Sequence, residues 1–131
     1  MLLLFLESES MTTPTPAELE ILQILWQYGE AKVQTVNDRL SELKPVGYTT
    51  TLKTMQIMEQ KGLLGRRKEG KSHIYFPLTA QTETQGSLLD KLLQSAFGGS
   101  KSQLVMQLLG NKKTSKKELD EIKAFLDSME K

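Results

Sequence analysis

Cysteine is absent from this chain of 131 residues, and histidine occurs once, at His73. The lack of thiols excludes a disulfide framework, thiolate metal sites and cysteine nucleophiles, and it fits a reducing, cytoplasmic location. Since no second ligand lies at a suitable spacing from His73, we predict no metal site and no cofactor. The chain also lacks a glycine-rich phosphate loop and a carboxylate pair near the histidine, so nothing indicates an enzyme.

Long apolar runs are also missing. The opening MLLLFLESES holds a six-residue apolar run without a preceding basic residue or a cleavage pattern, far below the roughly 20 residues that span a bilayer. We therefore predict no membrane insertion and expect residues 1–13 to be a disordered extension. We hypothesise that Met11 could serve as an alternative translation start.

The net charge of +1 is small, but it is unevenly distributed. Residues 49–80 hold six cations and two carboxylates, a local charge of +4, which leaves −3 for the rest of the chain. A basic surface on a nearly neutral chain favours a polyanionic partner.

Three helical patterns open the chain after the extension. A capping box at residues 15–18, TPAE, begins a helix that Gly29 can end. Apolar residues spaced by three and four predict a second helix from Val33 to Leu43 and a third over residues 48–62. The short segment at residues 30–32 could form a strand. Because the last two helices are joined by a tight turn, they predict a helix-turn-helix arrangement.

A hairpin follows the third helix. Residues 63–67 and 73–76 read as strands, and residues 68–71 form a turn that needs its glycine. Three helices followed by a two-stranded hairpin are the order of a winged helix. We therefore predict a mainly α fold with a small β-hairpin, in which residues 14–80 form a winged helix-turn-helix domain.

The third helix has two different faces on a helical wheel. Leu52, Met55 and Met58 lie on the apolar side. The opposite side offers short hydroxyl side chains and a lysine, which suit DNA base edges and phosphates: Thr49, Thr50, Lys53 and Thr54. Ile57 interrupts this polar face and is predicted either to pack on the hairpin or to touch a thymine methyl group. A solvated helix face is the alternative, but threonine is a poor helix former.

Cations gather along the hairpin. They could merely make the hairpin soluble, but their position beside a threonine-rich helix favours contacts with DNA phosphates. The residues predicted for this role are Arg66, Arg67, Lys68, Lys71 and His73.

Residues 81–131 contain three short amphipathic helices without a core of their own. We predict that they form a helical dimerisation domain, because a second copy of the same segment is the simplest cover for their apolar sides. The predicted dimerisation residues are Leu88, Leu89, Leu92, Leu93, Leu104, Leu108, Leu119, Ile122, Phe125 and Leu126.

In combination, these segments resemble the penicillinase and methicillin-resistance repressors, the BlaI/MecI type of winged-helix transcription regulators. The similarity covers nearly all of residues 14–131. It is carried by EILQILW at 20–26, the run at 48–64, GKSHIY at 70–75 and FGGS at 97–100, which precedes the helical tail.

The resemblance implies a sequence-specific repressor that binds a palindromic operator in double-stranded DNA as a homodimer. The family's Thr-Ile-Arg-Thr pattern matches residues 51–54 here, which makes Thr51 a base contact, although the wheel places it near the buried edge. Lysine at position 53 lacks the bidentate fork of arginine. The family is switched off by cleavage in the tail by a membrane-bound sensor peptidase, and the matching bond here is Gln107-Leu108.

One alternative remains open. Winged helices also serve as protein-interaction modules in larger assemblies, and such a module would not bind DNA directly. It would tolerate the loss of Lys53 and of the hairpin cations in any DNA assay.

Overall fold

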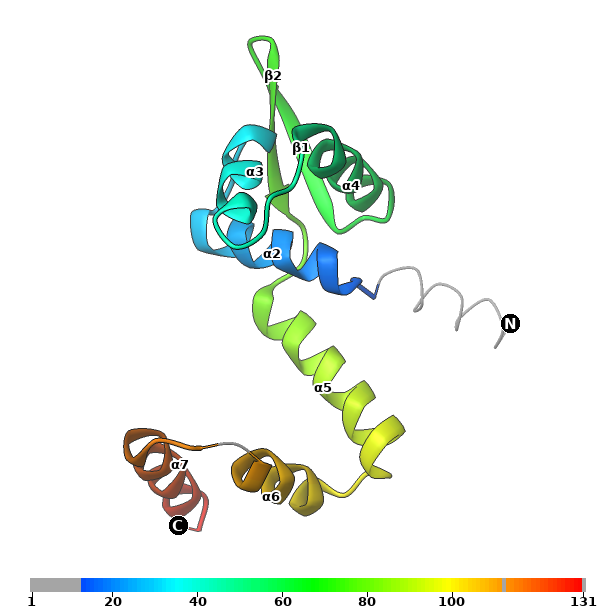
Figure 1. The fold of residues 1–131 in the computed structure, drawn as a ribbon. Coiled ribbons are helices and arrows are strands. Elements are labelled where there is room, and N and C mark those ends of the chain that lie inside the picture. Colours follow the sequence, from blue (N-terminus) through cyan, green and yellow to red (C-terminus); the bar gives the residue numbers. More distant parts are fainter. Residues whose placement is uncertain (1–12, 112, 131) are drawn as a thin grey trace, which may run out of the picture. The chain divides into compact units, whose positions relative to one another are not determined.

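A computed structural model describes residues 13–111 and 113–130 (Figure 1). The predicted disordered extension at residues 1–13 lies, except for Thr13, outside the described residues, as does the alternative start at Met11. The chain divides into two compact units between Leu88 and Leu89, within a helix. The elements of the first unit are α2 (Pro16–Tyr28), α3 (Val33–Ser41), α4 (Tyr48–Gln60), β1 (Leu64–Glu69) and β2 (Ser72–Pro77), followed by the start of α5 (Gln81–Phe97).

The beginning of α2 confirms the capping box. The Glu18 backbone N–H donates to Thr15 Oγ1 at 3.2 Å, and the Thr15 N–H donates to Glu18 Oε1 at 2.9 Å. Pro16 occupies the first helical position, where a missing N–H costs nothing. At the other end Gly29 adopts a φ of 85°, a conformation that glycine reaches without strain.

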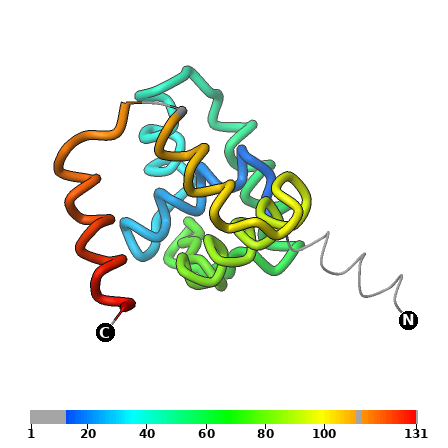
Figure 2. Tube along the Cα trace, turned by 90° about the horizontal axis from the view of Figure 1, so that it is seen from below, coloured from blue at the N-terminus to red at the C-terminus, as the bar shows by residue number. Residues whose placement is uncertain are grey.

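The core of the first unit lies among the three helices and the hairpin. α2 packs against both α3 and α4, as Figure 1 and the view from below in Figure 2 show. Met55 and Met58 of α4 are fully buried, as the helical wheel predicts. The buried apolar residues of this core are Ile21, Leu22, Leu25, Ala31, Val33, Val36, Met55, Met58, Leu63, Leu64 and Tyr75. Three helices packed on a two-stranded antiparallel hairpin form a winged helix.

The hairpin is longer than predicted, and its turn is tighter. Pairing continues outward to Glu69 and Ser72, so only Gly70 and Lys71 remain in the turn, and the predicted turn at residues 68–71 is corrected. Gly70 has a φ of 64°, which explains why this turn needs glycine. Ala31 forms an isolated antiparallel bridge with Tyr75, the short strand-like contact expected before α3.

The second unit contains the rest of α5, with α6 (Lys101–Asn111) and α7 (Lys116–Met129). The Glu118 N–H donates to Ser115 Oγ at 3.1 Å and caps the start of α7. Among the described residues, no side chain of α7 is buried. This unit therefore has several amphipathic helices but little core within one chain.

Candidate nucleic-acid interface

α4 presents a polar, solvent-exposed face beside the hairpin. Thr49, Thr50 and Lys53 are exposed on this face, as predicted from the wheel. Thr54 is only half exposed, and its hydroxyl donates to the Thr50 carbonyl oxygen at 2.9 Å. A hydroxyl held by its own helix is a weaker candidate for base contact than one that is free to donate. Lys53 is therefore the most available charged group on this face.

Thr51 differs from its predicted role. Its side chain is 1% exposed, and its hydroxyl lies 2.6 Å from Asn37 Oδ1 in α3. In the opposite amide orientation, which gives both ends of the Asn37 amide suitable partners, the atom at 2.6 Å from Thr51 Oγ1 is the amide nitrogen, which also lies within hydrogen-bonding distance of the carbonyl oxygens of Val46 and Gly47 in the turn. Thr51 thus connects α4 to α3 within the core. Its side chain is too buried to contact a base, which corrects its predicted role.

Two further residues of α4, Gln56 and Ile57, are exposed. Gln56 is exposed three residues after Lys53 and seven after Thr49, which places it on the same side of the helix. The sequence analysis did not name Gln56, although its spacing from Thr49 and Lys53 already placed it on the same face. A glutamine amide can form two hydrogen bonds with the edge of an adenine. Ile57 is 41% exposed, so it is accessible to a thymine methyl group.

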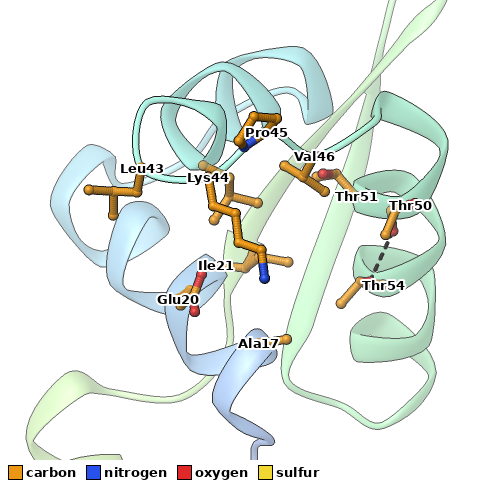
Figure 3. Close-up of a pocket in the computed structure, with 11 residues that line it drawn as sticks. Ala17, Glu20, Ile21, Leu43, Lys44, Pro45, Val46, Thr50, Thr51 and Thr54 are labelled. Atoms are coloured by element: carbon orange, nitrogen blue, oxygen red, sulfur yellow. Dashed lines mark hydrogen bonds between the residues drawn. The ribbon is translucent and has the colours of Figure 1, made fainter.

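A surface hollow of about 390 Å³ lies where α2, the turn and α4 meet. Thr50 and Thr54 lie on its α4 side, and Lys44 comes from the turn (Figure 3). The hollow is open and lies next to the first turns of α4. It therefore forms part of the surface that contains the candidate reading face.

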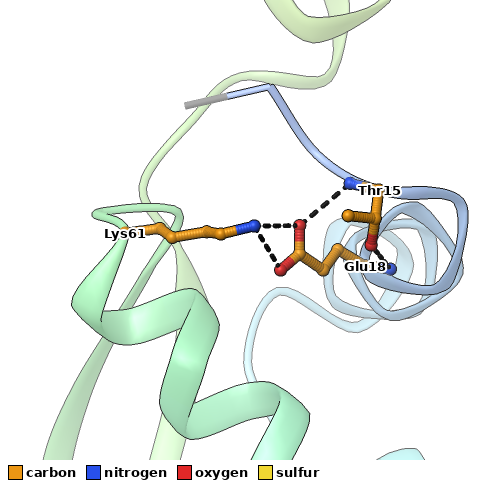
Figure 4. Close-up of polar contacts among 3 residues, drawn as sticks. All are labelled: Thr15, Glu18 and Lys61. Carbon is orange, nitrogen blue, oxygen red and sulfur yellow. Dashed lines mark hydrogen bonds and ion pairs between the residues drawn. The ribbon is translucent and has the colours of Figure 1, made fainter. Parts of the chain in front are cut away.

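An ion pair between a buried glutamate and a partly buried lysine joins the start of α2 to the end of α4 (Figure 4). Lys61 Nζ donates to both carboxylate oxygens of Glu18, at 3.0 and 2.9 Å. The Glu18 side chain is 5% exposed, and the same carboxylate accepts the Thr15 N–H. The capping residue predicted from sequence therefore also fixes the far end of the candidate recognition helix.

Both arginines of the hairpin are held by carboxylates. Arg66 Nε lies 2.8 Å from Glu59 Oε2 at the end of α4. Arg67 makes two hydrogen bonds to Glu30, at 2.7 and 2.6 Å, and a weaker contact with Glu69. The hydrogen bonds from Arg67 lower the pKa of the Glu30 carboxyl below its ordinary value, and the charge of Arg67 assists them.

The other cations of the hairpin are exposed. In the part of the chain that the structure describes, Lys53, Lys68 and Lys71 take part in no ion pair. Lys68 lies opposite His73 in the register of the two strands, and residues opposite each other across a hairpin lie on the same face. Arg66 lies on that face too and reaches α4, so Lys68 and His73 lie on the α4 side of the hairpin.

The predicted dimerisation residues are mostly accessible within the second unit. Phe125 is 64% exposed and Leu108 is 69% exposed, whereas Leu93 is already buried. Leu88 falls in the first unit. The partly or largely exposed members are Leu89, Leu92, Leu104, Leu108, Leu119, Ile122, Phe125 and Leu126.

A groove of about 620 Å³ runs through the second unit. Its apolar lining comes from all three helices: Leu92, Phe97, Leu104, Leu108, Leu109 and Ile122. The predicted cleavage residues, Gln107 and Leu108, line the same groove from the middle of α6.

No group of three His, Cys, Asp or Glu side chains in the described residues could hold a metal ion. Within the same residues, no helix combines the length and apolar character required to cross a membrane.

Residues 14–128 match the penicillinase repressor family, which leaves only the two ends of the chain unmatched. The chain belongs to this family. Its winged helix is therefore that of a family of transcriptional repressors, and the family resemblance inferred from the sequence is confirmed.

Individual relatives agree with this membership. The penicillinase repressor of Bacillus licheniformis is 26% identical over 115 residues, which cover 85% of this chain and 87% of that protein. The transcriptional regulator BlaI of Mycobacterium tuberculosis is 28% identical over 86 residues, or 64% of this chain and 62% of its own. The solution structure of the DNA-binding domain of the repressor BlaI matches 56% of this chain and 89% of its own, with a TM-score of 0.51 and 23% identity. This last likeness supports the fold.

Proposed function

We propose that this penicillinase repressor family member binds a palindromic operator in double-stranded DNA as a homodimer. The observation that carries the proposal is the exposed face of α4, with Lys53 at its centre, next to a hairpin whose Lys68 and Lys71 form no ion pair with any described residue. A helix of this kind fits the major groove, and hairpin cations suit the phosphates beside it. Phosphate contacts then supply affinity, and a few helix side chains supply sequence choice.

The homodimer is supported by the second unit. The groove through α5, α6 and α7 and the exposed Phe125 and Leu126 form an apolar surface that a single chain leaves in water. A second copy of the same surface covers it symmetrically, and a two-fold dimer would match a palindromic site. Bound dimers would repress by occluding a promoter.

Release by proteolysis belongs to the same proposal. Gln107 and Leu108 lie in α6, upstream of α7, so cleavage there separates α7 from the rest of the chain. The dimer would then lose the apolar side of α7, which includes Leu119, Ile122, Phe125 and Leu126. A membrane-bound sensor peptidase is the partner that the family resemblance implies.

The test begins with selection of bound duplexes from random DNA by the full chain. We expect a palindromic consensus whose half-sites lie about one helical turn apart, or a multiple of it. With roughly six phosphate contacts per dimer, log K should fall against log salt with a slope of about −5. An affinity that does not depend on salt, or a selection without any consensus, contradicts the proposal and leaves the protein-interaction module in its place.

Two variants separate the roles of helix and hairpin. Lys53→Ala should lower the ratio of operator to random-duplex affinity, because it removes a cation from the reading face. Lys68→Ala should weaken all duplexes by a similar factor and make the salt slope shallower by about 2 per dimer, one contact per protomer. Equal behaviour of the two variants would refute this division of roles.

A further inference from the structure

Glu30 forms a bidentate ion pair with the guanidinium group of Arg67. Arg67 Nη1 donates to Glu30 Oε1 at 2.7 Å, and Nη2 donates to Oε2 at 2.6 Å. Nη2 also lies 3.3 Å from Glu69 Oε2. The planar donor fork that would bind a phosphate is therefore already filled by carboxylates of the same chain.

The backbone sets this pair in place. Ala31 and Tyr75 exchange two backbone hydrogen bonds, each of 2.9 Å, so the segment before α3 is fastened to β2. Glu30 immediately precedes Ala31, and Arg67 lies on β1, which pairs with β2. A residue 37 positions away in sequence is thus held beside the hairpin by the fold and not by a chance approach of two long side chains.

The pair is too exposed to act mainly as a stabilising contact. The Arg67 and Glu30 side chains are each about half exposed, and surface ion pairs contribute little to stability. The same exposure makes Arg67 accessible to a phosphate. Carboxylates and phosphates use the same two-pronged arrangement of arginine donors, so they compete for it.

We propose that Glu30 is an intramolecular competitor that withholds Arg67 from DNA phosphates and so limits the sequence-independent affinity of the hairpin. Glu59 also engages Arg66, through a single contact between Arg66 Nε and Glu59 Oε2. Of the four hairpin cations, Arg66 and Arg67 lie within ion-pair distance of three carboxylates, those of Glu59, Glu30 and Glu69. Counted against Arg66, Arg67, Lys68 and Lys71, these carboxylates leave a net charge of +1. The affinity of the hairpin for DNA phosphates then depends on Lys68 and Lys71. The total affinity therefore depends more on the contacts between α4 and the bases. This inference rests on the proposed function.

The experiment compares the full chain with Glu30→Gln on a random-sequence duplex and on the selected operator. Glutamine keeps the shape of the side chain but removes the charge that holds Arg67. Because each protomer should then bind one additional phosphate, the salt slope should steepen by about 2 per dimer. The increase in affinity over the unchanged chain should be about tenfold larger at 50 mM than at 200 mM salt, for both duplexes.

Two controls separate competition from a general charge effect. Glu42→Gln removes the same charge from another exposed pair, Arg39 with Glu42 at 2.8 Å on α3, and should steepen the slope much less. Glu30→Gln combined with Arg67→Ala should abolish the increase in affinity, because the released cation is gone. An increase that persists without Arg67, a response equal to that of Glu42→Gln, or weaker binding by Glu30→Gln would each overturn the inference.

Failure of the inference differs from failure of the proposed function. If the unchanged chain selects a palindrome but Glu30→Gln behaves like Glu42→Gln, only the competitor role is refuted. If the unchanged chain binds neither duplex at any salt concentration, the proposed function is refuted, and this inference with it.

Discussion

Asn37 links α3 to both the turn and α4 through its side-chain amide. Its amide, on a side chain that is buried, contacts the buried Thr51 hydroxyl and the carbonyl oxygens of Val46 and Gly47 in the turn. Unpaired polar groups in such a position are costly, so each partner constrains the others. The orientation of the reading face therefore depends on a side chain that lies outside it.

Thr51→Val tests this structural role. Valine has nearly the same shape but no hydroxyl, so Asn37 loses a partner, and we expect a loss of about 1–2 kcal/mol in the free energy of unfolding. Denaturant unfolding measures the loss, and Thr50→Val on the exposed face is the matched control with little expected change. The selected operator should stay the same for Thr51→Val. An altered consensus with unaltered stability would return Thr51 to the base contacts.

The sequence predicted the faces of α4 but not the partners of its residues. Periodicity alone placed Met55 and Met58 in the core, and the wheel already put Thr51 near the buried edge, against the family match. The hydrogen bond with Asn37 could not be predicted, because it depends on how α3 packs on α4. The same holds for Arg67, whose partner Glu30 is brought close by the bridge between Ala31 and Tyr75.

At the scale of elements, the ion pair of Glu18 and Lys61 fastens the end of α4 to the start of α2. Both carboxylate oxygens accept from Lys61 Nζ, in a site where the Glu18 side chain is almost fully enclosed. Breaking one half of a buried pair leaves a charge without compensation. The packing of α4 on α2 is therefore sensitive to Lys61, which lies just beyond the last residue of α4.

Lys61→Met should lower the free energy of unfolding by about 3 kcal/mol, because it leaves the Glu18 carboxylate buried and unpaired. Thermal or denaturant unfolding of the full chain measures this. Adding Glu18→Gln should recover most of the loss, since glutamine is uncharged and still accepts the Thr15 N–H. Lys44→Met, a change at an exposed lysine, is the control. A loss that the second change does not reduce would mean that Lys61 acts through packing of its stem and not through its charge.

The elements themselves were largely predictable, because their signals are local. Capping boxes, helical periodicity and a glycine turn predicted each helix of the first unit and the hairpin. Differences appear at the ends of elements. The strands lengthen because backbone pairing continues to Glu69 and Ser72, whereas α3 ends at Ser41 and not at the predicted Leu43. No local pattern could place the boundary between the units inside a helix.

At the scale of the whole molecule, the two units contrast in how much they bury. The first has a contiguous apolar core, whereas in the second Leu93 is the only buried apolar residue among those the structure describes. Exposed apolar side chains of this number favour association. The proposed dimer would therefore stabilise the second unit and also bring together two winged-helix domains. One experiment can test both effects.

Leu126→Asp should convert the dimer into a monomer. Leu126 lies on α7 with more than half of its side chain exposed, so a single chain tolerates aspartate there, whereas an apolar interface would have to bury an unpaired charge. Light scattering over a range of concentrations measures the mass, and a chain that ends at Gln107 should behave in the same way. Lys123→Asp changes an exposed charge on the same helix and serves as the control. Monomers should still bind a half-site weakly, because the first unit is intact. If Leu126→Asp remains a dimer, the interface does not include this side of α7, and release by removal of α7 fails with it.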